Sequence, residues 1–466
     1  MLSDGDYFTQ RLFGVIYLRK PPGHTWAIAV SSAIFGKTEF AARLVGAASG
    51  VAMVVVAFLF ARRWFGPSAG FVAGVAQMLT PLFWKYQRSA EIEGLHNALV
   101  QIMVLLLVDL FVFQRDRRSR WMMAFVIACG VAVSGTVLAK GPASLPCFLG
   151  TLLAICLVER TREPLRSRTL WSVVAVAVAL ILPVAYMIVH RTMTATEQLV
   201  TQRVLGFFWE TSLFGVLSMI PSAWGQAFPV CLFLLTPWLH EQDPATRSNE
   251  NRIARVLAGS SLLSVLIYAT YGLTNPRYAM PAVTFVSLLV GYFVTARIPL
   301  SFRFAPISIQ PKLWKVPSRW GLRIGAIALI IAWVGYIGYL EPKARSRSGK
   351  EEGRRLAEIL PDGAHLCADT LIEARPETLG YAREYASKLG KVITIHWSPL
   401  PPDHLPAPPP AGMYVALRTD NDEWRYWKEA NLFDQIDWQT EGTVYKYHYL
   451  MGKVADRIPQ TARSHP

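Results

Sequence analysis

The stretch FAARLVGAASGVAMVVVAFLFARRWFG, residues 40–66, decides the fold class. It holds no charged side chain from residue 44 to residue 61, and Arg62 and Arg63 follow directly. An apolar helix of about 17 to 25 residues is long enough to cross the hydrocarbon layer of a bilayer. The stretch therefore predicts a transmembrane helix over residues 40–61 that ends at a basic membrane boundary.

Similar apolar stretches recur along the first 340 residues and predict about ten membrane spans. Between the fourth and the fifth, Lys140-Gly141-Pro142 interrupts the pattern, and proline breaks a helix because it lacks an N–H group. The sequence thus predicts an all-α, multi-pass membrane protein over residues 1–340. The predicted spans are residues 40–61, 68–84, 94–113, 121–138, 142–158, 170–189, 213–239, 256–273, 279–296 and 321–340.

The composition supports this class and excludes others. Of the 466 residues, 52% are hydrophobic and only 17% are charged, whereas soluble proteins have about 25% charged residues. The apolar content excludes a disordered or collagen-like chain, and five cysteines exclude a disulfide-rich scaffold. A net charge of +15 is typical of nucleic-acid binding in soluble proteins, but basic cytoplasmic loops produce the same excess in membrane proteins. We therefore expect the lipid bilayer as a partner and no nucleic acid.

The basic residues of the loops predict the orientation of the chain. One set of loops carries 19 of them and the opposite set only 6, so the positive-inside rule places the first set in the cytoplasm. With ten spans, residues 1–37 and the tail after Leu340 then lie outside. The first set is Arg62, Arg63, Arg115, Arg117, Arg118, Arg120, Arg160, Arg162, Arg166, Arg168, Arg247, Arg252, Arg255, Arg297, Arg303, Lys312, Lys315, Arg319 and Arg323; the second is Lys85, Arg88, Lys140, Arg191, Arg203 and Arg277.

The tail, residues 341–466, has the character of a soluble domain. It is polar, has a proline-rich break at residues 399–410, and mixes alternating segments with segments of helical period. It therefore predicts a small extracytoplasmic α/β domain. The expected strands are residues 364–369, 391–396, 412–418 and 442–449, and the expected helices are residues 349–360, 376–389 and 422–430.

Charged residues beside the predicted external membrane surface are candidate functional residues, because an ionisable group there is costly unless it is solvated or paired. The first group is Tyr17-Leu18-Arg19-Lys20-Pro21-Pro22. Its prolines favour extended backbone and hold Lys20 near the surface, where an ammonium group can meet a lipid phosphate. The alternative is a basic residue that snorkels beside an interfacial helix over residues 24–35.

A second group lies between two spans, where Arg88, Glu91 and Glu93 share one short external loop. Two carboxylates and an arginine could orient a sugar or act as a base. The alternative is a solvated loop in which Glu93, in the first turn of a helix, matches the helix dipole.

Two further loops each supply a cation. Lys140 lies in the helix break, and Arg277 precedes Tyr278. Arg277 offers a rigid donor fork suited to phosphate, or alternatively anchors the interface together with Tyr278 in the aromatic belt. Several external loops with one anion-binding group each favour an anionic lipid headgroup as the ligand.

Several short motifs, in their order and on one side of the membrane, resemble the polyprenyl-phosphate-dependent glycosyltransferases with the GT-C fold. These form glycosyltransferase family 39 and include protein O-mannosyltransferases and aminoarabinose lipid A transferases. The similarity covers about residues 1–340, and the tail also fits the family's plan. The motifs are Met1–Tyr7 with Tyr17–Pro22, Phe35–Leu44, Arg62–Gly66, Leu138–Pro142, and Arg277-Tyr278 with Pro281.

The resemblance implies an inverting glycosyltransferase, GT-C-like in its membrane part, that moves a sugar from a polyprenyl-phosphate carrier to a lipid, glycan or protein acceptor. It implies the outer face of the inner membrane as the place of transfer. Lys20 would hold the carrier phosphate, with Lys140 and Arg277 as further candidates, and Glu93, as the catalytic candidate, stands where the family usually has an Asp. The remaining substrate-site candidates are Tyr17, Arg88, Glu91 and Tyr278. No cofactor is expected, and no ligand cluster argues for a metal, although some relatives use one.

The chain departs from the family at its beginning. Arg19 stands where many relatives have Glu, and the family's presumed base is an Asp about ten residues before the Met1–Tyr7 stretch, after a first transmembrane helix. Both would precede Met1, and residues 1–20 contain no signal peptide, so we expect a start upstream of Met1. Two alternatives stay open: a relative that binds polyprenyl lipid without transfer, and a transporter, although the paired half-repeats of many transporters are not found.

Overall fold

The computed structural model describes residues 5–17, 20–114, 121–206, 221–227, 248–270, 276–296, 318–340, 349–368, 376–396, 410–419, 434, 436–444 and 447–455. Its contacts separate two compact units. The first comprises residues 1–10 and 17–333 and is helical. The second comprises residues 11–16 and 334–466 and contains a mixed sheet. Each unit is described by itself.

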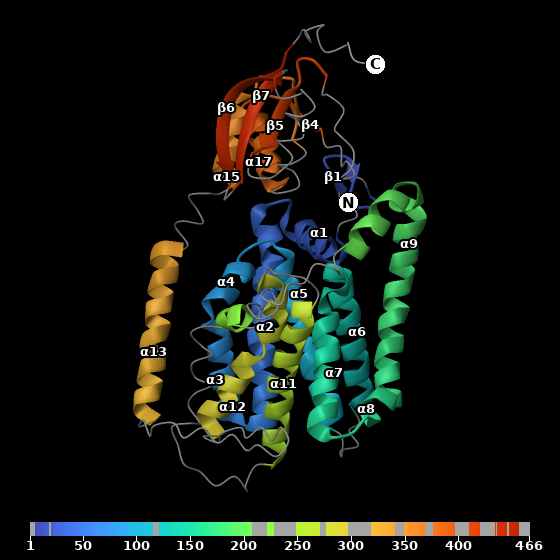
Figure 1. Cartoon of the computed structure of the whole chain (residues 1–466), viewed down its shortest axis with the longest axis vertical. Coiled ribbons are helices and arrows are strands. Elements are labelled where there is room, and N and C mark those ends of the chain that lie inside the picture. Colours follow the sequence, from blue (N-terminus) through green and yellow to red (C-terminus); the bar gives the residue numbers. More distant parts are fainter. Residues whose placement is uncertain are drawn as a thin grey trace. The chain divides into compact units, whose positions relative to one another are not determined.

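The helical unit is a multi-pass membrane bundle. Within the described residues, six apolar helical stretches are long enough to cross a bilayer, whereas the hydropathy pattern predicts about ten spans along the chain. The stretch from residue 122 to residue 159 consists of two consecutive helices joined by a short 3-10 turn (Figure 1). The elements are α2 (Glu39–Phe65), α5 (Ile92–Val108) with a π-helical turn (Asp109–Phe113), α6 (Met122–Lys140), α7 (Leu145–Glu159), α9 (Arg168–Gly206), α11 (Ser248–Thr270), and a 3-10 helix (Pro276–Val283) followed by α12 (Val286–Ala296).

Shorter helices complete this unit. They are α1 (Gly23–Phe35), α3 (Pro67–Met78), α4 (Pro81–Gln87), α8 (Glu163–Arg166) and α13 (Ser318–Gly335). The single helix predicted over residues 68–84 is divided at Thr80-Pro81 into α3 and α4, because Pro81 occupies the first turn of a new helix. Together the two helices return along α2, since Gly70 packs against Arg62 near the end of α2 and Gly50, nearer its start, packs against Gln87. Of the span predicted over residues 213–239, only residues 221–227 lie inside the described part.

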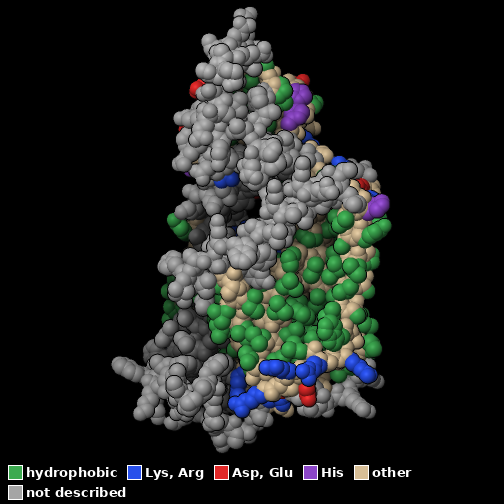
Figure 2. All heavy atoms as spheres, turned by 45° about the vertical axis from the view of Figure 1, so that its right-hand side comes forward, with side chains coloured by type: hydrophobic (Ala, Val, Ile, Leu, Met, Phe, Trp, Pro, Cys, Tyr) green, Lys and Arg blue, Asp and Glu red, His purple; other side chains and the backbone are tan. Residues whose placement is uncertain are grey.

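One end of the bundle is rich in exposed arginine residues. Arg160, Arg162, Arg166 and Arg168 are all exposed where α7, α8 and α9 meet. Figure 2 shows a broad hydrophobic surface over the bundle with Lys and Arg side chains gathered along its lower edge. The hydrophobic surface includes exposed apolar residues of α6, α7 and α9, as expected for helices that face lipid.

The second unit is built on a five-stranded sheet of order β4-β3-β5-β7-β6. β3 pairs in parallel with β4 and β5, whereas β7 is antiparallel to β5 and β6. The single strand predicted over residues 442–449 is wrong, because this stretch contains the end of β6 and the start of β7. The predicted helix over residues 422–430 lies outside the described residues. The elements are β1 (Arg11–Leu12), β2 (Val15–Ile16), α15 (Gly349–Ile359), β3 (Ala364–Cys367), α17 (Pro376–Lys388), β4 (Ile393–His396), β5 (Tyr414–Arg418), β6 (Ile436–Val444) and β7 (Tyr447–Val454).

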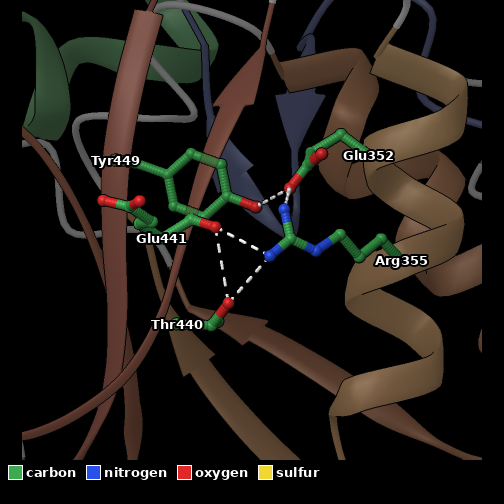
Figure 3. A network of polar contacts seen from close by, with 5 residues as sticks. All are labelled: Glu352, Arg355, Thr440, Glu441 and Tyr449. Carbon is green, nitrogen blue, oxygen red and sulfur yellow. Dashed lines mark hydrogen bonds and ion pairs between the residues drawn. The ribbon is translucent and has the colours of Figure 1, made fainter.

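A polar network ties α15 to the sheet (Figure 3). Arg355 donates to the Thr440 hydroxyl at 2.9 Å and to the Glu441 carbonyl at 2.8 Å, and its other Nη lies 3.5 Å from Glu352 Oε1. The Tyr449 hydroxyl donates to the same carboxylate. Burial and the neighbouring carboxylate raise the pKa of Tyr449, so its hydroxyl stays protonated and remains a donor. The network fixes α15 over β6 and β7.

Candidate functional site

A buried carboxylate at one end of the bundle is surrounded by cations. Glu93, in the first turn of α5, accepts a hydrogen bond from Lys140 Nζ at 3.2 Å, and Arg277 Nε lies 3.7 Å from the same oxygen. Glu93 and Lys140 are buried, whereas Arg277 is partly exposed. Residues from three distant parts of the chain thus meet at one carboxylate oxygen.

Local helix geometry places this pair. Lys140 is the last residue of α6, where Gly141 takes a φ of +69° and the chain passes into the 3-10 turn. Glu93 lies near a helix N-terminus, in the first turn of α5, whereas Lys140 lies at a helix C-terminus. Acidic groups are stabilised at helix N-termini and basic groups at C-termini, so both backbone ends support the charges that they carry. The predicted break at Lys140-Gly141-Pro142 therefore serves to present the ammonium group.

An aromatic ring lines the cationic side of the site. Lys140 Nζ lies 5.2 Å and Arg277 Cζ 5.4 Å from the centre of the Tyr278 ring. Contacts of cations with aromatic faces at such distances are attractive. Tyr278 thereby holds two like charges close together.

The N-terminal part of the bundle approaches the same site. Gly23 opens α1 against the end of α6, since a Cβ there would lie 2.6 Å from the Leu138 carbonyl oxygen. Lys20, which is exposed, lies within electrostatic range of Lys140. His24 Nε2 is 3.0 Å from the Ala90 carbonyl oxygen, and burial lowers the pKa of this histidine. His24 is therefore neutral near pH 7 and adds no further cation.

The other predicted site residues outside this group are Tyr17, Arg88 and Glu91. Tyr17 is half-buried and donates its backbone N–H to Gln10. Arg88 is exposed at the end of α4, and half-buried Glu91 occupies the position before α5. Arg88 and Glu91 thus lie in the short connection between α4 and α5, directly before Glu93. Within the described ranges, no group of three or more His, Cys, Asp and Glu side chains could hold a metal ion.

The structure adds two residues that the sequence analysis missed. His96 and Asn97 follow Glu93 by about one helical turn, and each is only 1% exposed. They lie inside the stretch predicted as a plain apolar span. The available signal is the i, i+4, i+8 row Glu93, Asn97 and Gln101, a polar stripe on an otherwise apolar helix.

Comparisons with known proteins match the membrane unit to glycosyltransferases. The family model described as dolichyl-phosphate-mannose-protein mannosyltransferase matches residues 19–187, which include Lys20, Glu93 and Lys140. Undecaprenyl phosphate-alpha-4-amino-4-deoxy-L-arabinose arabinosyl transferase 2 of Pseudomonas fluorescens is 26% identical over 321 residues, 64% of this chain and 54% of the relative. The corresponding transferase of Pseudomonas savastanoi is 30% identical over 190 residues, 39% of this chain and 33% of the relative. The chain spans about half the length of the first of these relatives.

Solved structures share the fold. The crystal structure of ArnT from Cupriavidus metallidurans in the apo state matches with a TM-score of 0.65 at 15% identity, covering 97% of this chain and 91% of that one. The same protein bound to undecaprenyl phosphate matches with a TM-score of 0.62 at 16% identity, covering 99% and 93%. The predicted GT-C-like membrane fold with a small C-terminal sheet domain is confirmed, as is the resemblance to aminoarabinose transferase-like, polyprenyl-phosphate-dependent glycosyltransferases.

Proposed function

We propose that this protein is an inverting membrane glycosyltransferase that moves a sugar from a polyprenyl-phosphate carrier to a lipid, glycan or protein acceptor. The curated relatives are named for undecaprenyl phosphate-linked aminoarabinose transfer, and the matching ArnT structure was obtained with undecaprenyl phosphate bound. A pentose such as aminoarabinose is accordingly the first sugar to test.

The observation that carries this proposal is the charge balance around Glu93. Lys20, Lys140 and Arg277 bring three positive charges to the site, and the one carboxylate among them leaves a formal excess of two. Of the three cations only Lys140 is buried, and the repulsion between it and the other two is weakly screened there unless a further anion joins them. A polyprenyl phosphate supplies that anion at the membrane surface, and its apolar polyprenyl chain lies in the bilayer.

In this proposal the three cations bind the carrier phosphate and stabilise it as the leaving group. Negative charge develops on the phosphate oxygen as the bond to the sugar breaks, and prepositioned cations lower the energy of that state. Phosphate takes over part of the contact that Lys140 and Arg277 make with Glu93. The released carboxylate is then available to hydrogen-bond and orient the acceptor's nucleophilic group.

The same proposal includes a location. The arginine-rich end around α8 faces the cytoplasm, because basic loops stay on that side. The Glu93 end then faces outward at the inner membrane, and the C-terminal domain, residues 341–466, is periplasmic. The membrane part, residues 1–340, carries the transferase site.

The test is binding and transfer by the full chain in lipid nanodiscs. We expect the protein to bind undecaprenyl phosphate and to release sugar from glycosylated undecaprenyl phosphate when an acceptor lipid is present. Lys140→Met should weaken carrier binding about tenfold or more, since a charge-assisted contact to phosphate is lost. Lys85→Met is the matched control, because Lys85 is exposed on α4 and belongs to the same set of sparse basic residues.

Three outcomes are informative. Binding and transfer together support the proposal as stated. Binding without transfer would favour a carrier-binding relative without catalysis. A chain that binds no undecaprenyl phosphate would contradict the proposal.

A further inference from the structure

Three polar atoms are left without partners one helical turn inside the membrane from Glu93. His96 Nδ1, Asn97 Oδ1 and Asn97 Nδ2 are buried and have no hydrogen-bond partner within the described part of the chain. Buried polar atoms in proteins are nearly always paired with protein groups or water. Inside a bilayer the need is stronger, because lipid offers no partner. These atoms therefore call for a polar occupant.

The histidine is held so that it presents an acceptor. Of its two ring nitrogens only Nδ1 is without a partner among the described residues, so we assign the ring proton to Nε2, on the side of the ring near the Thr136 backbone of α6. In the neutral imidazole the other nitrogen then carries a lone pair. His96 thus offers an acceptor, and the Asn97 amide beside it offers one acceptor and two donors. This set complements groups that both donate and accept, as hydroxyl groups do.

The position of this pair relative to the cations indicates which ligand group would reach it. His96 lies within electrostatic range of both Lys140 and Lys20. Along α5, His96 and Asn97 lie about 4.5 to 6 Å beyond Glu93, at about 1.5 Å per residue. A phosphate held by the cations would therefore bring one of its two substituents, the sugar or the polyprenyl chain, to this level of the helix. Of the two, the sugar matches this polar set, because the polyprenyl chain has no group that donates or accepts a hydrogen bond.

We propose that His96 and Asn97 form a binding subsite for the sugar of the donor, in which they hydrogen-bond its hydroxyl or amino groups. This inference rests on the proposed function, since it assumes that the cations hold the carrier phosphate. It assigns phosphate recognition to Lys20, Lys140 and Arg277, and sugar recognition to the next turn of α5. Neither residue takes part in the chemical step of transfer in this proposal.

The experiment compares glycosylated and bare carriers on the full chain in nanodiscs. The probes are undecaprenyl phosphate alone, undecaprenyl phosphate bearing 4-amino-4-deoxy-L-arabinose, and undecaprenyl phosphate bearing mannose. The wild type should bind at least one glycosylated probe more tightly than the bare carrier. Asn97→Leu keeps the shape of the side chain and removes the amide. It should lower the affinity for the preferred glycosylated probe about tenfold, as expected for one or two lost hydrogen bonds. The affinity for the bare carrier should stay unchanged. His96→Phe should act in the same way.

The control is Gln101→Leu, the same kind of change about one turn deeper on α5 and farther from the cations. Its Nε2 donates to the Met53 carbonyl at 3.5 Å, whereas its buried Oε1 has no partner within the described residues, as in Asn97. It should alter neither affinity. Thermal stability separates a binding role from a structural one: Asn97→Leu removes unpaired polar atoms, so the melting temperature should stay equal or rise.

A fall in melting temperature with equal weakening of all probes would overturn the subsite and indicate a water-filled structural site. Unchanged affinities in Asn97→Leu and His96→Phe, or no preference of the wild type for either glycosylated probe, would overturn it while leaving carrier binding intact. A wild type that fails to bind even the bare carrier would contradict the proposed function itself.

Discussion

The ammonium nitrogen of Lys140 lies 3.2 Å from Glu93 Oε1, with both side chains no more than 5% exposed. The two residues are 47 positions apart in the chain. A buried ion pair is weak evidence for stability, because desolvating both charges offsets much of their attraction. Removal of one partner, in contrast, destabilises the fold strongly, because the remaining charge is then buried without a counter-charge. The pair is therefore a sensitive point for both folding and binding.

Replacement of Glu93 separates catalysis from folding. In Glu93→Gln, we expect transfer to be lost because the acceptor is no longer oriented by a carboxylate, while binding of undecaprenyl phosphate persists or tightens because phosphate meets less competition for Lys140 and Arg277. Without ligand the variant should be less stable by about 3 kcal/mol, as for other broken buried pairs. Transfer assays and thermal unfolding with and without undecaprenyl phosphate measure these effects.

A role limited to helix capping predicts a different result. The dipole contribution of an acidic residue in the first turn is about 0.3 to 1 kcal/mol, and Glu93→Gln would then retain transfer. Full activity in this variant would remove Glu93 from the site.

Charge removal at Arg277 should give a graded effect. Arg277→Lys keeps the charge but lacks the planar donor fork, so we expect the affinity for undecaprenyl phosphate to fall by several fold, and by more in Arg277→Gln. Titration of the carrier into nanodiscs measures both. Equal affinities in the wild type and Arg277→Gln would place the phosphate elsewhere.

Orientation can be tested independently of chemistry. The proposed orientation, with the arginine-rich end around α8 in the cytoplasm, predicts that a reporter fused after Gly349 behaves as periplasmic. A cysteine introduced at exposed Arg162 should react with membrane-impermeant reagents only after the cells are opened. Cytoplasmic-type activity of the Gly349 fusion would overturn the topology and the outward-facing site with it.

The fold was predictable wherever local pattern decides it. The apolar run of α2 and the break after Lys140 follow from hydropathy and from one proline. The stretch 68–84 is divided into two helices at Thr80-Pro81, a helix-start signal that the hydropathy analysis did not use because the apolar pattern continues through it. The predicted strand over residues 442–449 failed because two β-rich segments adjoin there with a very short connection.

The site was predictable only in part. Glu93, Lys140 and Arg277 stood out as charges beside spans, but nothing local says that they share one oxygen atom, since such contacts depend on how helices pack. His96 and Asn97 were missed for the opposite reason: their neighbours on α5 are so apolar that the span masks them. The unpaired state of their polar atoms is a property of packing alone.

In the C-terminal domain, the Arg355 network should contribute measurably to local stability. Arg355→Met loses the hydrogen bonds to Thr440 and Glu441, and because the side chain is partly exposed we expect a loss of about 1 kcal/mol. Hydrogen exchange of β6 in the full chain should report it. Arg354→Met is the matched control: its exposed pair with Glu358 predicts a smaller change. Equal effects of the two variants would contradict a specific role for the network.

The last prediction concerns two histidines on neighbouring strands of the same sheet. His365 Nδ1 lies 2.8 Å from His396 Nε2, so one ring donates to the other, which requires at least one of the two nitrogens to be unprotonated. Burial, and to a lesser degree the neighbouring His365, lowers the pKa of His396 from its ordinary 6.5. Below pH 6.5 the unfolded chain therefore binds protons that the folded domain does not, and stability falls as the pH drops from 6.5 toward the folded pKa.

We expect protection of β3 and β4 against hydrogen exchange, corrected for intrinsic rates, to be lower at pH 5.5 than at pH 7.5. His396→Gln should flatten this dependence, whereas His448→Gln, on exposed β7 surface, should retain it. The same pH dependence in His396→Gln as in the wild type would show that other groups cause it.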